Sequence, residues 1–317
     1  MKISGFSFVR NGIKLYYPAV EMIQSILPLV DEFVIAVGKG DEDDTTRKHI
    51  LEINSPKVKI IDTIWNLGKY PRGMEHAHQT DIAKNECTGD WLFYLQGDEV
   101  VHEKDLPVIH KRCEELLYNY KVEGLLFGYY HFWGDYYHYH NSHGWYPYEI
   151  RIIRNDSDIH SWESAQSFRR IPRFDGINYR QQEGTYKLKV AQVDAHIYHY
   201  GWVRPPYLMQ NKRRYFHTNH WGYKKAKEHY DKIDNYFDYG PLNKLTTFHG
   251  THPEVMKNKI KECNWQNKLQ YSGKANPYRK AYKHEKLKYK ILTWIEKNIN
   301  SGKQIASFKN YILLRNI

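Results

Sequence analysis

The chain has 317 residues, of which 41% are hydrophobic and 15% aromatic, and its formal net charge is +11. This composition is typical of a globular protein with a sizeable core, and no apolar run approaches the roughly 20 residues that a membrane-spanning helix needs. The three cysteines, Cys87, Cys113 and Cys263, lack the spacing of a disulfide framework or a zinc cluster, so we expect a cytoplasmic protein.

The excess of positive charge lies in one part of the chain. Residues 206–317 carry 23 basic and 8 acidic residues, whereas residues 1–205 carry 24 and 28. A basic chain raises the question of nucleic acid. Because the first two thirds are slightly acidic, the charge points instead to a basic extension over 206–317 that meets an anionic partner.

Strands and helices alternate over the first hundred residues. Apolar runs predict strands over 3–9, 33–37, 58–61 and 91–95, and apolar residues at helical spacing predict helices over 17–30, 45–53 and 74–87. This alternation predicts a doubly wound, mostly parallel α/β sheet. Ligands bind such sheets beyond the carboxyl ends of the strands. The polar loops after the first, second and fourth strands are therefore expected to meet in one crevice.

The second hundred residues are less regular. The aromatic stretch over 125–148 is expected to cross the open edge of the sheet, and further strands are predicted over 150–154, 187–193 and 195–200. Arg204, Pro205 and Pro206 then break the pattern, and Lys-rich segments with helical character follow.

The run Gln96-Gly97-Asp98-Glu99 follows the most apolar of the predicted strands. Acidic side chains at the end of a strand can hold a divalent cation against a diphosphate. An isolated pair of acids is more often a solvated turn. The position directly after a buried strand favours a binding site.

Residues 89–99, Gly-Asp-Trp-Leu-Phe-Tyr-Leu-Gln-Gly-Asp-Glu, resemble the strand and metal-binding motif of family-2 glycosyltransferases with the GT-A fold. The likeness extends from residue 3 to about 204 and includes residues 6–11, 79–83 and 198–202. It implies a catalytic domain over 1–205, with a donor half over about 1–100 and an acceptor half over about 101–205. It also implies inverting, metal-assisted transfer of a sugar from a nucleotide-diphosphate sugar to a glycan or lipid-linked acceptor.

The resemblance also assigns residues to the donor site. It implies a Mn²⁺ or Mg²⁺ ion at Asp98, Glu99 and His199. Gln96 stands where the family has its first acid, and its amide offers an oxygen without a charge, which weakens metal binding. Lys212 is a further candidate for the diphosphate. The residues assigned to the nucleotide sugar are Val9, Arg10, Asn11, Asp41, Asp81, Gln96, Gly97 and Arg204.

An inverting transferase needs a general base for the acceptor hydroxyl. The resemblance assigns this role to Glu163, next to Trp162, and makes Asp98 the second catalytic residue; Asp156 and Asp158 are the alternatives for the base. An ordinary loop glutamate is the competing interpretation of Glu163. For Asp41, the interpretation that competes with nucleotide binding is a loop that caps the next helix.

Aromatic rings stack on the C–H faces of sugars. Trp133, Tyr136 and Trp162 are the candidate acceptor contacts. A half-buried hairpin is an equally good interpretation of this aromatic stretch. A zinc site at His138, His140 and His143 is the weaker alternative, because no cysteine or carboxylate is placed beside them.

Apolar and basic residues alternate over 286–295, which predicts a helix that rests on an anionic membrane surface, or else one that docks on the core. Two other functions compete with glycosyl transfer. A nucleic-acid-binding protein would use the basic aromatic extension but leaves the acidic loops unexplained, so no nucleic acid partner is expected. A nucleotidyltransferase would need a glycine- and lysine-rich phosphate loop after the first strand, where this chain has Arg10-Asn11-Gly12.

Overall fold

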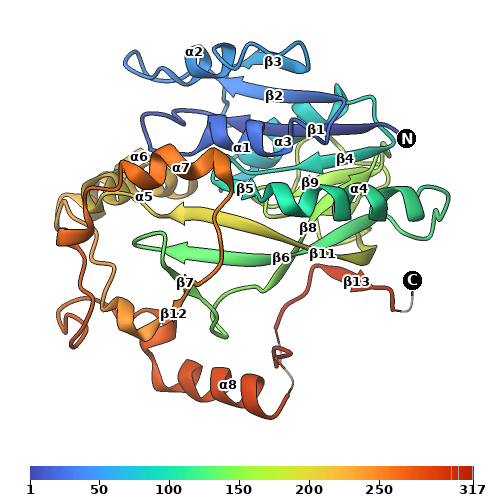
Figure 1. Ribbon diagram of the computed structural model, residues 1–317. Coiled ribbons are helices and arrows are strands. Elements are labelled where there is room, and N and C mark those ends of the chain that lie inside the picture. The colour runs from blue at the N-terminus through green and yellow to red at the C-terminus, as the bar shows by residue number, and fades with distance from the viewer. Residues whose placement is uncertain (301, 306, 316) are drawn as a thin grey trace.

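A computed structural model describes residues 1–300, 302–305, 307–315 and 317 (Figure 1). The first hundred residues alternate strands and helices as predicted. The elements are β1 (Ile3–Val9), α1 (Ala19–Ile26), β2 (Glu32–Gly38), α2 (Thr46–Leu51), β3 (Val58–Thr63), α3 (Met74–Asn85) and β4 (Trp91–Tyr94). Helix α1 is shorter than the predicted range 17–30, because Pro18 and Pro28 flank it and proline cannot continue a helix.

The strands form one mixed sheet in the order β3-β2-β1-β4-β8-β6-β11-β10-β9. Strands β1 to β4 are mutually parallel, β8 (Tyr148–Arg154) runs antiparallel to β4 and β6, and β6 (Gly124–Trp133) is parallel to β11 (Tyr186–Trp202). The predicted α/β class with a mostly parallel sheet is confirmed. The remaining strands are β5 (Glu99–Val101), β7 (His138–His140), β9 (Ile159–Trp162), β10 (Ser167–Arg170), β12 (Thr246–Thr247) and β13 (Tyr311–Leu313).

Two sequence predictions about the sheet were wrong. Residues 124–133 do not cross an open edge: as β6 they lie between β8 and β11 and are buried along almost their whole length. A strand covered on both faces has a continuous apolar run, and alternation cannot distinguish it from other apolar segments. The two strands predicted over 187–200 are one strand, β11, whose register against β6 shifts between Gln192 and His196.

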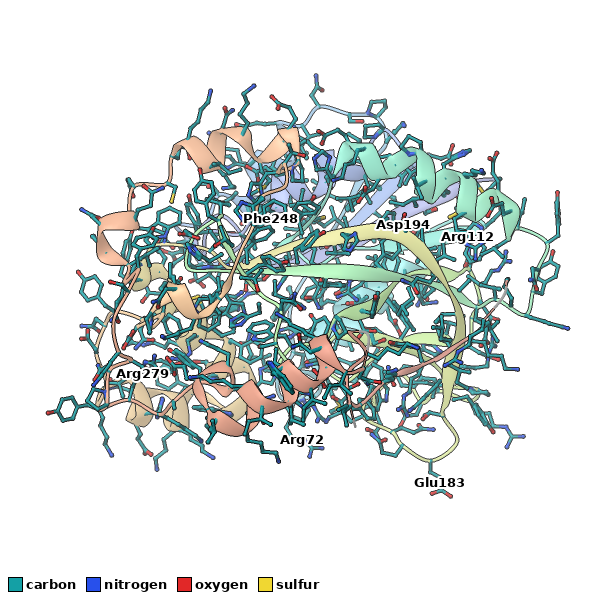
Figure 2. The ribbon with its side chains drawn as sticks, turned by 60° about the horizontal axis from the view of Figure 1, so that its bottom comes forward. Arg72, Arg112, Glu183, Asp194, Phe248 and Arg279 are labelled. Carbon is teal, nitrogen blue, oxygen red and sulfur yellow. The ribbon has the colours of Figure 1, made fainter. Side chains whose placement is uncertain are left out.

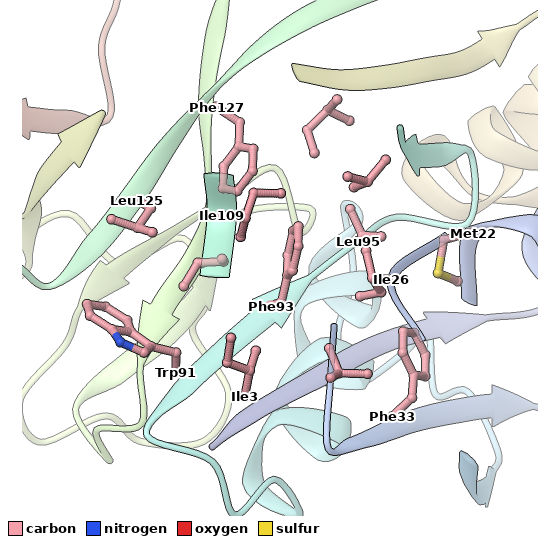
Figure 3. Close-up of a cluster of buried hydrophobic side chains, with 14 of the residues drawn as sticks. Ile3, Met22, Ile26, Phe33, Trp91, Phe93, Leu95, Ile109, Leu125 and Phe127 are labelled. Carbon is pink, nitrogen blue, oxygen red and sulfur yellow. The ribbon is translucent and has the colours of Figure 1, made fainter. Parts of the chain in front are cut away.

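Side chains of successive strand residues enter two cores on opposite faces of the sheet. Phe33 and Ile35 of β2 belong to one cluster, and Val34 and Ala36 belong to the other. Figure 3 shows part of the first cluster, where Met22 and Ile26 of α1 meet side chains of neighbouring strands. Helix α4 (Leu106–Glu115) packs on the same face, and α3 covers the opposite one.

The basic extension packs around the same sheet. Its helices are α5 (Pro206–Trp221), α6 (Tyr223–Tyr230), α7 (Lys257–Lys261) and α8 (Leu287–Asn298), with 3-10 turns at Leu242–Lys244, Glu254–Met256, Gln266–Lys268 and Lys283–Glu285 and an earlier one at Glu103–Asp105. Phe248, labelled in Figure 2, lies against Phe132 of β6 with ring centroids 5.1 Å apart. Near the end of the chain, β13 joins the sheet beside β11 (Figure 1).

In the described part of the chain, no helix combines the length and the apolar character that crossing a membrane requires.

Candidate functional site

A cavity of about 450 Å³ opens at the carboxyl edge of β1 and β4. These strands are parallel neighbours, so the loops that follow them meet at one end of the sheet. Six residues predicted for the donor site lie together in its lining. They are Val9, Arg10, Gln96, Gly97, Asp98 and His199.

Helix α5 supplies a whole wall of this cavity. It lies beyond the boundary predicted near residue 205, and of its residues only Lys212 was predicted to be at the site. The signal was a helix that combines basic and aromatic residues directly after Pro205 and Pro206. Its lining residues are Met209, Lys212, Arg213, Tyr215, Phe216, His217 and Asn219. Other lining residues that the sequence analysis did not identify are Phe8, Tyr17, Trp65, His76, Trp145, Tyr146, Ser164, Gln166 and Trp202.

Asp98 is the one carboxylate among the described lining residues, and it is buried. Its Oδ2 lies 3.0 Å from Nζ of Lys212 and 3.7 Å from Nε2 of His199. Burial alone would raise the pKa of Asp98, but the charges of Lys212 and His199 outweigh it and hold this pKa far below its usual value. Gly201 leaves the space for this arrangement, since a Cβ there would lie 2.6 Å from Oδ2 of Asp98. Asp98 is therefore ionised at neutral pH.

Burial, assisted by the charge of Arg204, lowers the pKa of Lys212 to about 8 although Asp98 opposes the shift. The Lys212 ammonium donates to Asp98 and, at 2.7 Å, to the backbone carbonyl of Gly201. An ammonium has three N–H donors. One of them therefore has no partner among these contacts, and Lys212 lines the cavity.

His131 orients the ring of His199. Burial, with His199 next to it, lowers the pKa of His131 well below its usual value, so this imidazole is neutral. Its Nε2 lies 2.8 Å from the carbonyl of Tyr146, which can only accept, so Nε2 carries the proton. Nδ1 of His131 then accepts the Nδ1–H of His199 at 3.0 Å. Nε2 of His199 then faces Asp98, at 3.7 Å from its Oδ2.

Glu99, predicted as a metal ligand, is held by Arg151 and does not line the cavity. Its two carboxylate oxygens each lie 2.7 Å from a nitrogen of Arg151, and both side chains are fully buried. The hydroxyl of Tyr129 and the backbone N–H of Gln96 also donate to this carboxylate, at 2.8 and 3.0 Å. Burial opposes the charge of Arg151, but Glu99 outweighs it and raises the Arg151 pKa. Glu99 fixes the turn after β4 instead of facing the cavity.

The predicted acceptor residues also lie outside the cavity. Trp133 and Tyr136 are 3% and 1% exposed and belong to the cores between the sheet and the extension. Trp162 is covered by the Arg169 guanidinium, whose carbon lies 3.8 Å from the ring centroid. The rings that do face the cavity include Trp65, on a loop, and Trp202, on β11. Large aromatic residues are common both in cores and in binding sites, and the sequence gives no way to separate the two.

Four residues that were predicted to bind the nucleotide do not line the cavity. Their side chains contact other residues of the protein instead. Oδ1 of Asn11 accepts the backbone N–H of Asp41 at 2.8 Å, and the Asp41 carboxylate pairs with Lys14 at 2.8 Å. Asp81 is buried against Nδ1 of His160 at 2.7 Å. Arg204 is fully buried and donates to the carbonyl of Leu15. These contacts hold the loops around the site.

Glu163 lies next to Ser164, which lines the cavity, but Glu163 itself is outside the lining. Its side chain is 26% exposed, and its Oε1 is 3.9 Å from Nη2 of Arg180. The backbone of Glu163 is left-handed, with φ of 57°. The alternatives Asp156 and Asp158 both face Arg170, at 2.7 and 3.4 Å. The role of Glu163 as the base stays a prediction.

The side chains around Asp98 determine whether a divalent cation fits this site. Over residues 1–300, 302–305, 307–315 and 317, no group of three or more His, Cys, Asp or Glu side chains is placed to hold a metal ion, and this includes His138, His140 and His143. Asp98 and His199 supply two ligands, but Glu99 is engaged by Arg151 and Lys212 sits on Asp98. Manganese and magnesium prefer several oxygen ligands. These residues do not fit a resident divalent cation.

Two lining residues carry buried hydrogen-bond donors that have no partner in the described part of the chain. Nε1 of Trp65 and Nδ2 of Asn219 are buried, lie in lining residues and make no hydrogen bond within the described structure. Trp65 reaches its position because Gly38 has no side chain: a Cβ there would lie 2.4 Å from Nε1. Buried polar groups are normally paired. Together with Arg10 and Lys212, these donors suit an anionic ligand rich in oxygen acceptors.

No protein-family model and no curated protein sequence matches the chain. Among solved structures, S. aureus TarS 1-349 has 14% identity and a TM-score of 0.37, over 69% of this chain and 65% of that one, which is less than two thirds of its length. The same fragment has also been solved with UDP-GlcNAc, where the TM-score is 0.36. Glucosyl-3-phosphoglycerate synthase from Mycobacterium tuberculosis, solved with Mn²⁺ and UDP, has 16% identity and a TM-score of 0.29, over 42% of this chain and 45% of that one. These likenesses are remote, and the function of this chain rests on the residues of its own cavity.

Proposed function

We propose that the chain is a glycosyltransferase that moves a sugar from a nucleotide-diphosphate sugar to a glycan or lipid-linked acceptor. The observation that carries the proposal is the chemistry of the cavity at the carboxyl edge of β1 and β4. Among its described lining residues, Asp98 is the one carboxylate, against the cations Arg10, Lys212 and Arg213, and Trp65 and Asn219 carry donors without a described partner. A nucleoside diphosphate combines negative charge, many acceptor oxygens and a flat base, and these are the properties that such a cavity complements.

Different residues of the cavity are assigned to the diphosphate and to the base of this ligand. Lys212 and Arg10 are the donors for the diphosphate. The indole of Trp65, with the Arg10 guanidinium carbon 5.6 Å from its centroid, supplies an aromatic surface for the base. A cavity with walls on several sides favours a small ligand over a nucleic acid strand, which binds along an open groove.

A screen for hydrolysis of nucleotide sugars tests the proposal. The purified chain is incubated with UDP-, GDP-, ADP-, CDP- and dTDP-sugars, with and without manganese, and release of nucleoside diphosphate is measured. We expect release from at least one donor above the rate without protein. Salt-dependent binding of generic oligonucleotides with no release from any donor would contradict the proposal.

Inverting transfer is the finer part of the proposal, and Glu163 is its base. Glu163→Gln should lower the transfer rate by about 100-fold or more while the affinity for the donor stays nearly constant, because a general base acts on the acceptor in the transition state. Single-turnover transfer and donor titration measure the two quantities. Glu183→Gln is the matched control, because Glu183, which is labelled in Figure 2, is an exposed loop residue. Unchanged transfer by Glu163→Gln would remove this residue from the base role.

We propose further that α8 brings the enzyme to the cytoplasmic face of a membrane. Leu287, Ile291 and Trp294 recur at helical spacing and are 72%, 50% and 60% exposed. Lys288 and Lys290 on the same helix are exposed as well. An exposed apolar stripe flanked by lysines matches a surface of anionic lipid headgroups.

The double variant Leu287→Ser, Trp294→Ser should bind vesicles of phosphatidylserine and phosphatidylcholine at least about 10-fold more weakly, because two apolar side chains no longer enter the lipid interface. Co-sedimentation measures the change. Tyr118→Ser, at a side chain 82% exposed on a distant turn, should bind as the wild type does. Equal binding by the double variant would contradict membrane contact through α8.

A further inference from the structure

Helix α5 places Lys212 next to Asp98, the carboxylate that faces the cavity. Pro205 is extended, with φ of −50° and ψ of 139°, and α5 begins at Pro206. Lys212 lies in the second turn of this helix, and its Nζ reaches Oδ2 of Asp98 at 3.0 Å and the Gly201 carbonyl at 2.7 Å. Only 13% of its side chain is exposed. A long flexible side chain is thus held in one position by two acceptors.

The charges of the residues after β4 explain why the Lys212 ammonium is the cation next to Asp98. Gln96 contributes no charge, and its amide nitrogen is engaged by the Ala165 carbonyl at 2.7 Å. Glu99 is neutralised by Arg151. Asp98 alone therefore balances Lys212. A divalent cation on the same carboxylate would lie beside a positive charge and be repelled.

We propose that the Lys212 ammonium takes the place of a divalent cation in this site and stabilises the leaving nucleoside diphosphate. The inference rests on the proposed function and deepens it. Asp98 and Gly201 position the ammonium, and its remaining N–H is available to a phosphate oxygen. A charged donor fixed before the reaction stabilises developing negative charge without reorganising at that moment.

The transfer step balances with this assignment. The bond between the anomeric carbon and the diphosphate oxygen breaks, and its electron pair remains on the diphosphate, whose added charge faces Lys212. The acceptor oxygen forms the new bond to the anomeric carbon. In the proposed transfer the acceptor proton goes to the base, Glu163. In donor hydrolysis a water molecule is itself the acceptor, and its proton is released to solvent water. Lys212 neither gains nor loses a proton.

Calorimetric titration with UDP, GDP, ADP, CDP and dTDP tests the inference, once in EDTA and once in manganese chloride. We expect the wild type to bind at least one of them in EDTA, with an affinity that manganese changes by less than about 3-fold. Lys212→Met, which keeps the length of the side chain and removes its charge, should bind about 10- to 100-fold more weakly in EDTA, as expected for a lost charge-assisted hydrogen bond. Manganese should recover part of this loss, because the site then has a free carboxylate and no ammonium.

Two further variants serve as controls for the loss of charge and for an unrelated surface change. Lys212→Arg retains the charge and should bind more tightly than Lys212→Met, which a merely structural role would not require. Lys224→Met, on the exposed surface of α6, should bind as the wild type does. Thermal melting of each variant establishes that it is folded.

The outcomes separate the two proposals. If the wild type binds a nucleoside diphosphate only with manganese, or if Lys212→Met binds normally in EDTA, the role of Lys212 is overturned while the transferase proposal stands. If the wild type binds none of the five in either buffer, the proposed function falls and takes this inference with it.

Discussion

Asp98→Asn is expected to lower the rate of donor turnover about 100- to 1000-fold, the effect typical of losing one charged contact that serves the transition state. The amide keeps the shape of the side chain but removes the charge that holds Lys212 at 3.0 Å and faces His199 at 3.7 Å. The ammonium then loses its fixed position in the cavity. Release of nucleoside diphosphate from the donor found in the screen measures the effect.

Asp62→Asn is the matched control for this experiment. Asp62 is exposed, pairs with Arg47 at 2.7 Å on the surface and is not among the lining residues of the cavity. It should turn over donor at the wild-type rate. If Asp98→Asn is folded, as shown by an unchanged melting profile, and also turns over at the wild-type rate, the donor site has been assigned to the wrong cavity.

Arg151→Met is expected to reduce the free energy of unfolding by about 3 to 5 kcal/mol, because it leaves the Glu99 carboxylate buried without its partner. Both side chains have 0% exposure, and Arg151 additionally donates to the carbonyls of Ile150 and Gln166. Urea denaturation followed by tryptophan fluorescence measures the loss. Arg47→Met, at the exposed pair with Asp62, should cost less than about 1 kcal/mol.

A double variant separates an unpaired charge from a lost contact. Glu99→Leu combined with Arg151→Met removes both charges and should recover much of the stability that Arg151→Met loses, since apolar side chains of similar volume often replace a buried ion pair at little cost. If the double variant is no more stable than Arg151→Met alone, the hydrogen bonds of the pair, and not its unbalanced charge, dominate.

The sequence by itself determined the architecture of the first hundred residues. Alternation of apolar runs and helical periodicity in residues 3–95 specifies a parallel sheet, because burial on two faces needs those patterns. The position of Arg10 and Asp98 directly after two strands then placed them at one edge. These inferences succeeded because each depends on neighbours in the chain. The prolines that shorten α1 act equally locally and were visible in the sequence.

Tertiary structure decided which polar and aromatic side chains face the cavity. Glu99 and Asp98 are adjacent in sequence, yet one is fixed by Arg151, which is 52 residues away, and the other by Lys212, which is 114 residues away. Trp133 became core because the extension packs over β6, whereas Trp65 faces the cavity because Gly38 leaves room for it. Ion pairs and packing between distant segments depend on how the chain closes in space, and residue spacing carries no record of that closure. For this reason the sequence located the edge of the sheet where the cavity lies, and only the folded chain showed that α5 lines this cavity and places the Lys212 ammonium on Asp98.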